Sequence, residues 1–147
     1  MEALSGSNNP KTRPQLLTVL AVLSFIGSGM SLFSYIVISF GFDAVVNILE
    51  TEMKDVYPEM LVDFIKDAGK TFFMIGSLAY AVSLLGIYKM WNLHKIGLHY
   101  YAISQFVILL LPLIFISTKL SILPGLLITL FFIVLYNRSF NIIEKHK

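Results

Sequence analysis

Four apolar segments, each long enough to cross a bilayer as a helix, constrain the fold of this chain more than any other feature. They cover residues 16–42, 71–88, 96–116 and 120–136. A hydrocarbon core about 30 Å thick requires about 20 helical residues. The segments also lack the alternation of apolar and polar residues that a membrane β-barrel needs. The sequence therefore predicts an all-α fold, an integral membrane four-helix bundle.

The composition agrees with this fold and excludes several other classes of protein. Hydrophobic residues make up 56% of the 147 residues and charged residues only 14%, a balance for which membrane lipids are the expected surroundings. The chain contains no cysteine, which excludes disulfides and thiolate metal sites. Its basic residues stand at the ends of the apolar segments and form no stripe, so we expect no nucleic-acid partner.

The positions of the basic residues predict the orientation of the bundle. They lie before the first segment, between the second and third, and after the fourth, at Lys11, Arg13, Lys89, Lys95, Arg138, Lys145 and Lys147. Because loops rich in lysine and arginine stay in the cytoplasm, we expect both termini to be cytoplasmic and residues 43–70 to be extracytoplasmic. Residues 1–14 are then a flexible cytoplasmic tail, and residues 15–147 form a single four-span domain.

Small residues recur at intervals of three or four in the first two segments, which places them on one face of each helix. These residues are Ser24, Gly27, Ser28, Ser31, Gly76, Ala79, Ser83 and Gly86. In lipid, small residues let helix backbones approach closely, and serine hydroxyls add about 0.6 kcal/mol for each bond between helices. We predict that the two faces pack against each other. A phosphate-binding loop at residues 27–29 would require a strand before it and the start of a soluble helix after it. The sequence has neither, so it favours the packing role.

The segment between the first two spans, residues 43–70, has the periodicity of an amphipathic helix. Its apolar residues follow one another at intervals of three or four, at Val45, Leu49, Met53, Val56, Met60 and Phe64. Pro58 interrupts the pattern, so we expect two helical pieces, the second beginning at the proline. Helices that lie on a membrane surface are usually basic, whereas this segment is acidic. We therefore expect its apolar face to cover the end of the bundle.

An acidic row follows Pro58, formed by Glu59, Asp63 and Asp67 at intervals of four. Like charges at this spacing repel each other on a helix, and Lys66 and Lys70 are the nearest compensating charges. Three interpretations are open: a solvated face, a docking face for a partner protein, and a site for a divalent cation.

An ionisable residue near the middle of a span is the usual mark of a transport or proton pathway. None of the four spans contains one. Gln105 is the most polar residue at that depth, and we expect it to form a contact within the membrane with a neighbouring helix. His94 and His99 are about 140° apart around a helix and cannot share a metal ion. No hydrolase, zinc-protease or nucleotide-binding motif is present. We therefore expect no enzymatic activity, no cofactor and no metal.

Two stretches, RPQLLTVLAVLSFIGSG at residues 13–29 and KMWNLHKIGLHYYAISQ at residues 89–105, resemble small four-span membrane proteins of bacterial genomes. That group has no assigned activity, and the resemblance covers about a quarter of the chain. It implies location in the bacterial inner membrane and adds no catalytic residue.

These features favour a structural or interaction role, as an accessory subunit bound to another membrane protein or as a bundle that associates with itself. The alternative is a subunit of a small channel or transporter that works as an oligomer, because Pro112 and Pro124 lie inside spans and free backbone carbonyls there. A lipid-modifying enzyme has the least support, since the candidate acids all lie in the external segment without a histidine beside them.

Overall fold

A computed structural model describes residues 14–53, 55–116 and 123–145. The secondary structure of these residues consists of helices: α1 (Gln15–Phe40), α2 (Phe42–Thr51), α3 (Glu59–Trp91), α4 (Ile96–Phe115) and α5 (Leu123–Lys145). Among the described residues, α1, α3, α4 and α5 are long and apolar enough to cross a membrane. Nearly all of the predicted tail, residues 1–13, and residues 117–119 between the third and fourth predicted spans lie outside the described residues.

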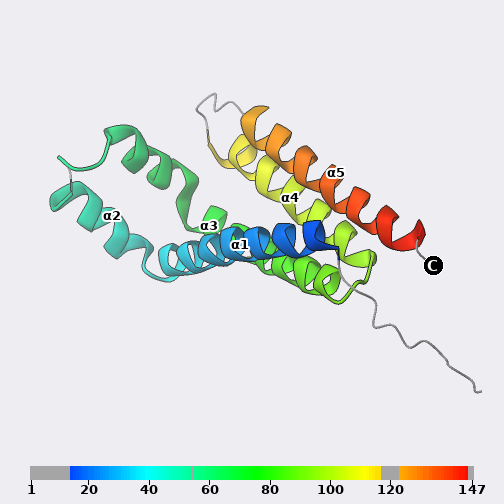
Figure 1. The fold of residues 1–147 in the computed structure, drawn as a ribbon. Helices are drawn as coiled ribbons and strands as arrows, with labels where there is room; N and C mark the ends of the chain where they lie inside the picture. Colours follow the sequence, from blue (N-terminus) through cyan, green and yellow to red (C-terminus); the bar gives the residue numbers. More distant parts are fainter. Residues whose placement is uncertain (1–13, 54, 117–122, 146–147) are drawn as a thin grey trace, which may run out of the picture.

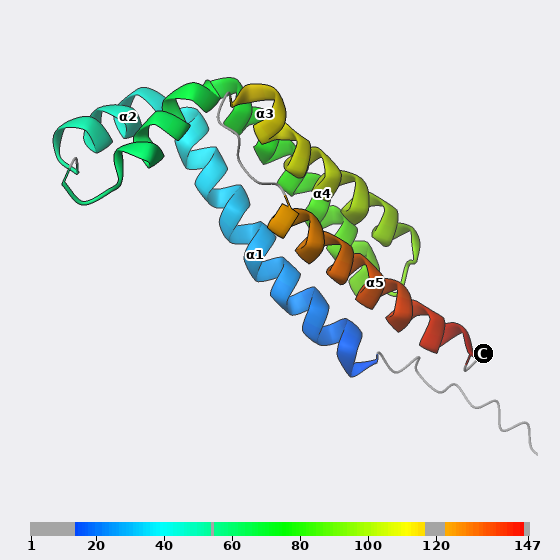
Figure 2. The ribbon, with the colours of Figure 1, turned by 90° about the horizontal axis from the view of Figure 1, so that it is seen from above.

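The long helix α3 lies at the centre of the bundle. It packs along α1 on one side and along α4 on the other, while α5 packs against α4 and α1 (Figure 1). The start of α1 and the end of α5 lie at the same end of the bundle (Figure 2). An even number of crossings would place both ends on one side of a membrane.

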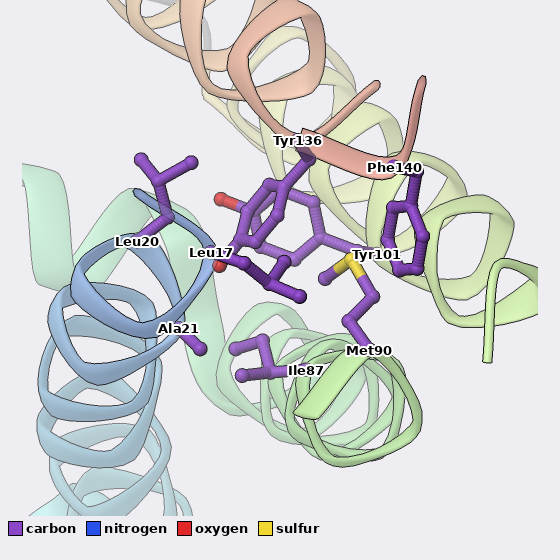
Figure 3. Close-up of a cluster of buried hydrophobic side chains, with 8 residues drawn as sticks. All are labelled: Leu17, Leu20, Ala21, Ile87, Met90, Tyr101, Tyr136 and Phe140. Atoms are coloured by element: carbon purple, nitrogen blue, oxygen red, sulfur yellow. The ribbon is translucent and has the colours of Figure 1, made fainter. Parts of the chain in front are cut away.

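At that end of the bundle, the four long helices share one core cluster (Figure 3). Its buried members are Leu17, Leu20, Ala21, Ile87, Met90, Tyr101, Tyr136 and Phe140. The rings of Tyr101 and Tyr136 meet edge to face with centroids 5.4 Å apart, a geometry that aromatic pairs prefer. This cluster holds α5 in the bundle, because it joins α5 to the other three helices.

A second core cluster occupies the opposite end of the bundle. Its buried members come from α2, α3 and the end of α4: Leu49, Ile65, Ala68, Phe72, Phe73, Leu111 and Ile116. The Tyr35 ring of α1 packs edge-on against Phe73 at a centroid distance of 5.3 Å. The core at this end is therefore richer in aromatic rings and includes the segment between the first two long helices.

Two glycines mark where the chain bends between the bundle and this segment. Gly41 separates α1 from α2, and Gly69 breaks the helical geometry inside α3 with φ 68° and ψ 167°. Only glycine adopts that backbone conformation readily. Pro58 caps the start of α3, so α2 and residues 59–68 are the two helical pieces that the sequence predicts.

We refer to α2 together with residues 59–68 of α3 as the amphipathic hairpin. Its two helices lie side by side beyond the end of α1 (Figures 1 and 2). We expected its apolar face to cover the end of the bundle, and its buried residues do share the second core cluster with Leu111 and Ile116 at the end of α4. The backbone of α2 itself lies close only to α3 and the adjoining end of α1 among the described helices. Pairing the two short helices buries Leu49 and Ile65, and it leaves the far end of the hairpin exposed.

Pro112 and Pro124, which the sequence places inside spans, have different positions in their helices. Pro112 lies inside α4, where its missing N–H removes a helical hydrogen bond. Pro124 is the second residue of α5, and a proline in the first turn of a helix requires no kink. Only α4 therefore has an interior proline among the described helices.

Candidate functional site

A chain of hydrogen bonds links three helices in the middle of the bundle. The Ser28 hydroxyl of α1 lies 3.1 Å from the Ser83 hydroxyl of α3, and both side chains are buried. The Gln105 amide of α4 donates to the same Ser83 oxygen over 3.2 Å. Gln105 thus contacts a neighbouring helix, the arrangement expected for a lone glutamine in a span, and its amide binds protein rather than facing an open pathway.

A second polar contact joins α5 to α1. The Tyr136 hydroxyl donates to the Ser24 oxygen over 2.9 Å, and the Tyr136 side chain is fully buried. The sequence identified Ser24 only as a small packing residue and did not predict this acceptor role. Its tyrosine partner is 112 residues away in the chain, so no local pattern could reveal the pair.

Gly86 in α3 and Gly97 in α4 let the backbones of these two helices approach closely. A Cβ placed on Gly86 would lie 2.7 Å from the Tyr101 nitrogen and 2.9 Å from the Gly97 oxygen. Gly86 therefore faces α4, whereas we expected it to face the first span. Gly97 was missed because it stands alone near the start of its helix, without the repeated small residues that signal a packing face.

The remaining small residues differ in their surroundings. Gly76 packs under the Tyr35 ring, which occupies the place of a side chain there, and Ala79 is buried. Ser31 is half-buried. Gly27 is exposed, and a Cβ on it would meet no atom within 4 Å. The contact face of α1 therefore runs through Ser24 and Ser28 and leaves Gly27 outside.

The acidic row lies on the exposed surface of the amphipathic hairpin, and Glu59 and Asp63 also line a hollow beside Leu49 and Glu50 of α2. Glu59, Asp63 and Asp67 are exposed. They border an open depression of about 580 Å³ whose other lining residues are Pro58, Met60, Leu61 and Phe64. The depression is thus apolar inside and negatively charged along its edge.

The two lysines near this row do not both neutralise it. Lys66 pairs with Glu50 of α2 over 2.5 Å; hydrogen bonding to Glu50 raises the pKa of Lys66, and the charge of that carboxylate adds to the effect. Lys70 follows the bend at Gly69 and lines a groove between α1 and α3. Lys66 still interacts with the charges of Asp63 and Asp67, whereas Lys70 faces the groove between α1 and α3.

The described side chains show no cluster of the kind that holds a metal ion. Residues 14–53, 55–116 and 123–142 contain no group of three histidine, aspartate or glutamate side chains placed to bind a metal ion. Every buried side-chain nitrogen or oxygen in this part of the chain has a hydrogen-bond partner. The polar groups of the bundle thus bind one another, and the exposed surface of the hairpin is the stronger candidate for recognition. No protein-family model, curated protein or solved structure matches the chain.

Proposed function

We propose that this chain is a multi-pass protein of the bacterial inner membrane, with both termini in the cytoplasm and the amphipathic hairpin outside. Large apolar side chains on the outer faces of the long helices support membrane insertion; Phe33 is 70% exposed and Ile114 is 73% exposed. Exposed apolar surface of this extent is unusual for a protein in water. In a bilayer the same side chains contact lipid.

Its proposed role is to bind another membrane protein as a non-enzymatic accessory subunit. The observation that carries this proposal is the exposed apolar surface at the tip of the hairpin. Met60, which lines the depression edged by acids, and Val56, in the connection between the two short helices, are each 71% exposed. An apolar patch bordered by polar residues marks an interaction surface. Its negative edge favours a partner that presents apolar side chains together with lysine or arginine.

A photo-crosslinking experiment in native membranes tests this role. A crosslinking amino acid at Met60 is expected to capture one different membrane protein in stoichiometric amount. The same amino acid at Leu127, an exposed residue of α5, is the control and is expected not to capture that protein. Reversing the row with Glu59→Lys and Asp63→Lys should abolish the product, whereas Glu52→Lys outside the depression should retain it.

The crosslinked products separate the possible outcomes. A product containing only copies of this chain would replace the accessory role with self-association. Absence of any protein product at Met60, or retention of the product in the charge-reversed variant, would refute docking at the acidic row.

A channel or transporter subunit is the second candidate, supported by the proline inside α4. Pro112 leaves the α4 backbone able to bend, and several copies of the chain would be needed to surround a pore. The bond from Gln105 to Ser83 weighs against it, because this amide is already engaged within one copy. Flux through liposomes containing the purified protein, absent from empty liposomes, would favour this candidate over the accessory role.

A further inference from the structure

A groove of about 300 Å³ lies between α1 and α3, close to the end of α1. Its walls are apolar: Ile36 and Phe40 come from α1, and Met74 and Leu78 come from α3. These side chains are exposed, Phe40 most of all at 88%. No other described helix covers the groove, so it opens to whatever surrounds the bundle.

Lys70 places a positive charge at one end of this groove. Lys70, Met74 and Leu78 follow one another at intervals of four on α3 and therefore share a face. At a rise of 1.5 Å per residue, Leu78 lies about 12 Å beyond Lys70 along the helix. No acidic side chain lines the groove. The surface is thus cationic at one end and apolar along its length.

The other polar residues of the groove are already engaged. Ser39 donates its hydroxyl proton to the Tyr35 carbonyl over 2.7 Å, and Ser77 donates to the Phe73 carbonyl over 2.7 Å. Lys70 forms no ion pair or hydrogen bond with another described residue. Its ammonium is therefore the one donor among the lining residues that is available to a ligand.

We infer that this groove binds an anionic glycerophospholipid. The Lys70 ammonium pairs with the headgroup phosphate, and one acyl chain lies along Phe40, Met74 and Leu78. The inference rests on the membrane insertion proposed above. Lys70 directly follows the bend at Gly69, where α3 leaves the bundle and where a membrane boundary with its phosphates is expected. Basic side chains near a membrane surface attract anionic headgroups, and lysine recognises phosphate as a point charge. In the orientation proposed above, these headgroups belong to the outer leaflet.

Native mass spectrometry of the purified protein in detergent tests the inference, with phosphatidylglycerol and phosphatidylcholine as the titrated lipids. Lys70→Gln is expected to weaken binding of phosphatidylglycerol about fivefold, which corresponds to about 1 kcal/mol for one lysine near an anionic lipid. Binding of phosphatidylcholine should fall less, because its choline cation offsets the charge of its phosphate, and Lys70→Arg should restore the preference. Lys66→Gln removes an equal charge outside the groove and should bind both lipids as the wild type does.

A variant of the apolar wall tests the acyl-chain contact separately. Phe40→Ala removes a side chain that is almost fully exposed, so it should fold normally and bind both lipids more weakly. Equal affinity of the wild type for the two lipids, or equal losses in Lys70→Gln and Lys66→Gln, would overturn the inference. Displacement of the lipid by inorganic phosphate would show that the site takes a free anion. The lipid titration uses the purified protein without a partner. A negative result in it would therefore not affect the proposed partner contact at Met60, and a negative crosslinking result at Met60 would not affect the proposed lipid site.

Discussion

Replacing Gly86 by alanine is expected to force α3 and α4 apart. The added Cβ would lie 2.7 Å from the Tyr101 nitrogen, 2.9 Å from the Gly97 oxygen and 3.1 Å from the Tyr101 Cα. All three are backbone atoms, so no side-chain rotation can relieve the overlap. Because comfortable contacts begin near 3.5 Å, the two helices must separate by about 0.8 Å.

The cost of this separation can be set against the preference of helices for alanine. Overpacking a core costs about 1–3 kcal/mol, and rigid backbone neighbours place Gly86→Ala near the upper value. Alanine in a helix interior returns about 1 kcal/mol relative to glycine. We therefore expect the free energy of unfolding to fall by about 2 kcal/mol.

Unfolding of the purified protein by a denaturing detergent, followed by tryptophan fluorescence, measures this loss. The chain has a single tryptophan, Trp91, which packs against the core cluster shared by the four long helices. Gly27→Ala is the matched control, because it lies inside α1 and its Cβ meets no atom within 4 Å. That variant should be as stable as the wild type or more stable. Equal stability of Gly86→Ala and Gly27→Ala would refute the close glycine contact.

Three further substitutions test the polar contacts and the bend. Tyr136→Phe removes the hydroxyl that donates to Ser24 and should lower the free energy of unfolding by about 0.6 kcal/mol; the same substitution in a Ser24→Ala background should cost less, and an equal cost would exclude the bond. Gln105→Leu breaks the bond to Ser83 and should lower the free energy of unfolding by about 0.6 kcal/mol in the same detergent titration. An unchanged free energy of unfolding would contradict the bond. Gly69→Ala places a side chain at a positive φ, a backbone strain that costs about 1–3 kcal/mol. The strained bend should relax and change the angle between the hairpin and the bundle. Unchanged distances between spin labels on these two parts would contradict this expectation.

The helical fold follows from features that are local in the sequence. A run of apolar residues about 20 long predicts a membrane helix because each turn satisfies its own backbone, so the described helices α1, α3, α4 and α5 could be anticipated. Pro58 signalled the start of α3 because proline fits the beginning of a helix. Such features depend on neighbours within a few positions.

The pairing of faces could be predicted only in part, since it depends on residues far apart in the chain. The repeated small residues indicated helix packing, and Ser28 does meet Ser83. The same pattern could not show that Gly86 meets α4 while Gly27 faces outward, because a helix presents small residues on more than one face. Gly97 and Tyr136 lack any repeat, and their partners are defined by the tertiary arrangement alone.

The distribution of satisfied and unsatisfied groups indicates where this protein meets other molecules. In the described part of the bundle, buried polar side chains all have hydrogen-bond partners within one copy. The two exposed surfaces on which the proposals rest lie on either side of Gly69: the acidic row with Met60 on the hairpin, and Lys70 in the groove. Because Gly69 turns α3 out of the bundle, one bend separates a surface suited to a basic protein from a surface suited to an anionic lipid. Both proposed interactions are therefore placed at the same end of the molecule, where protein binding and lipid binding can be measured with separate variants.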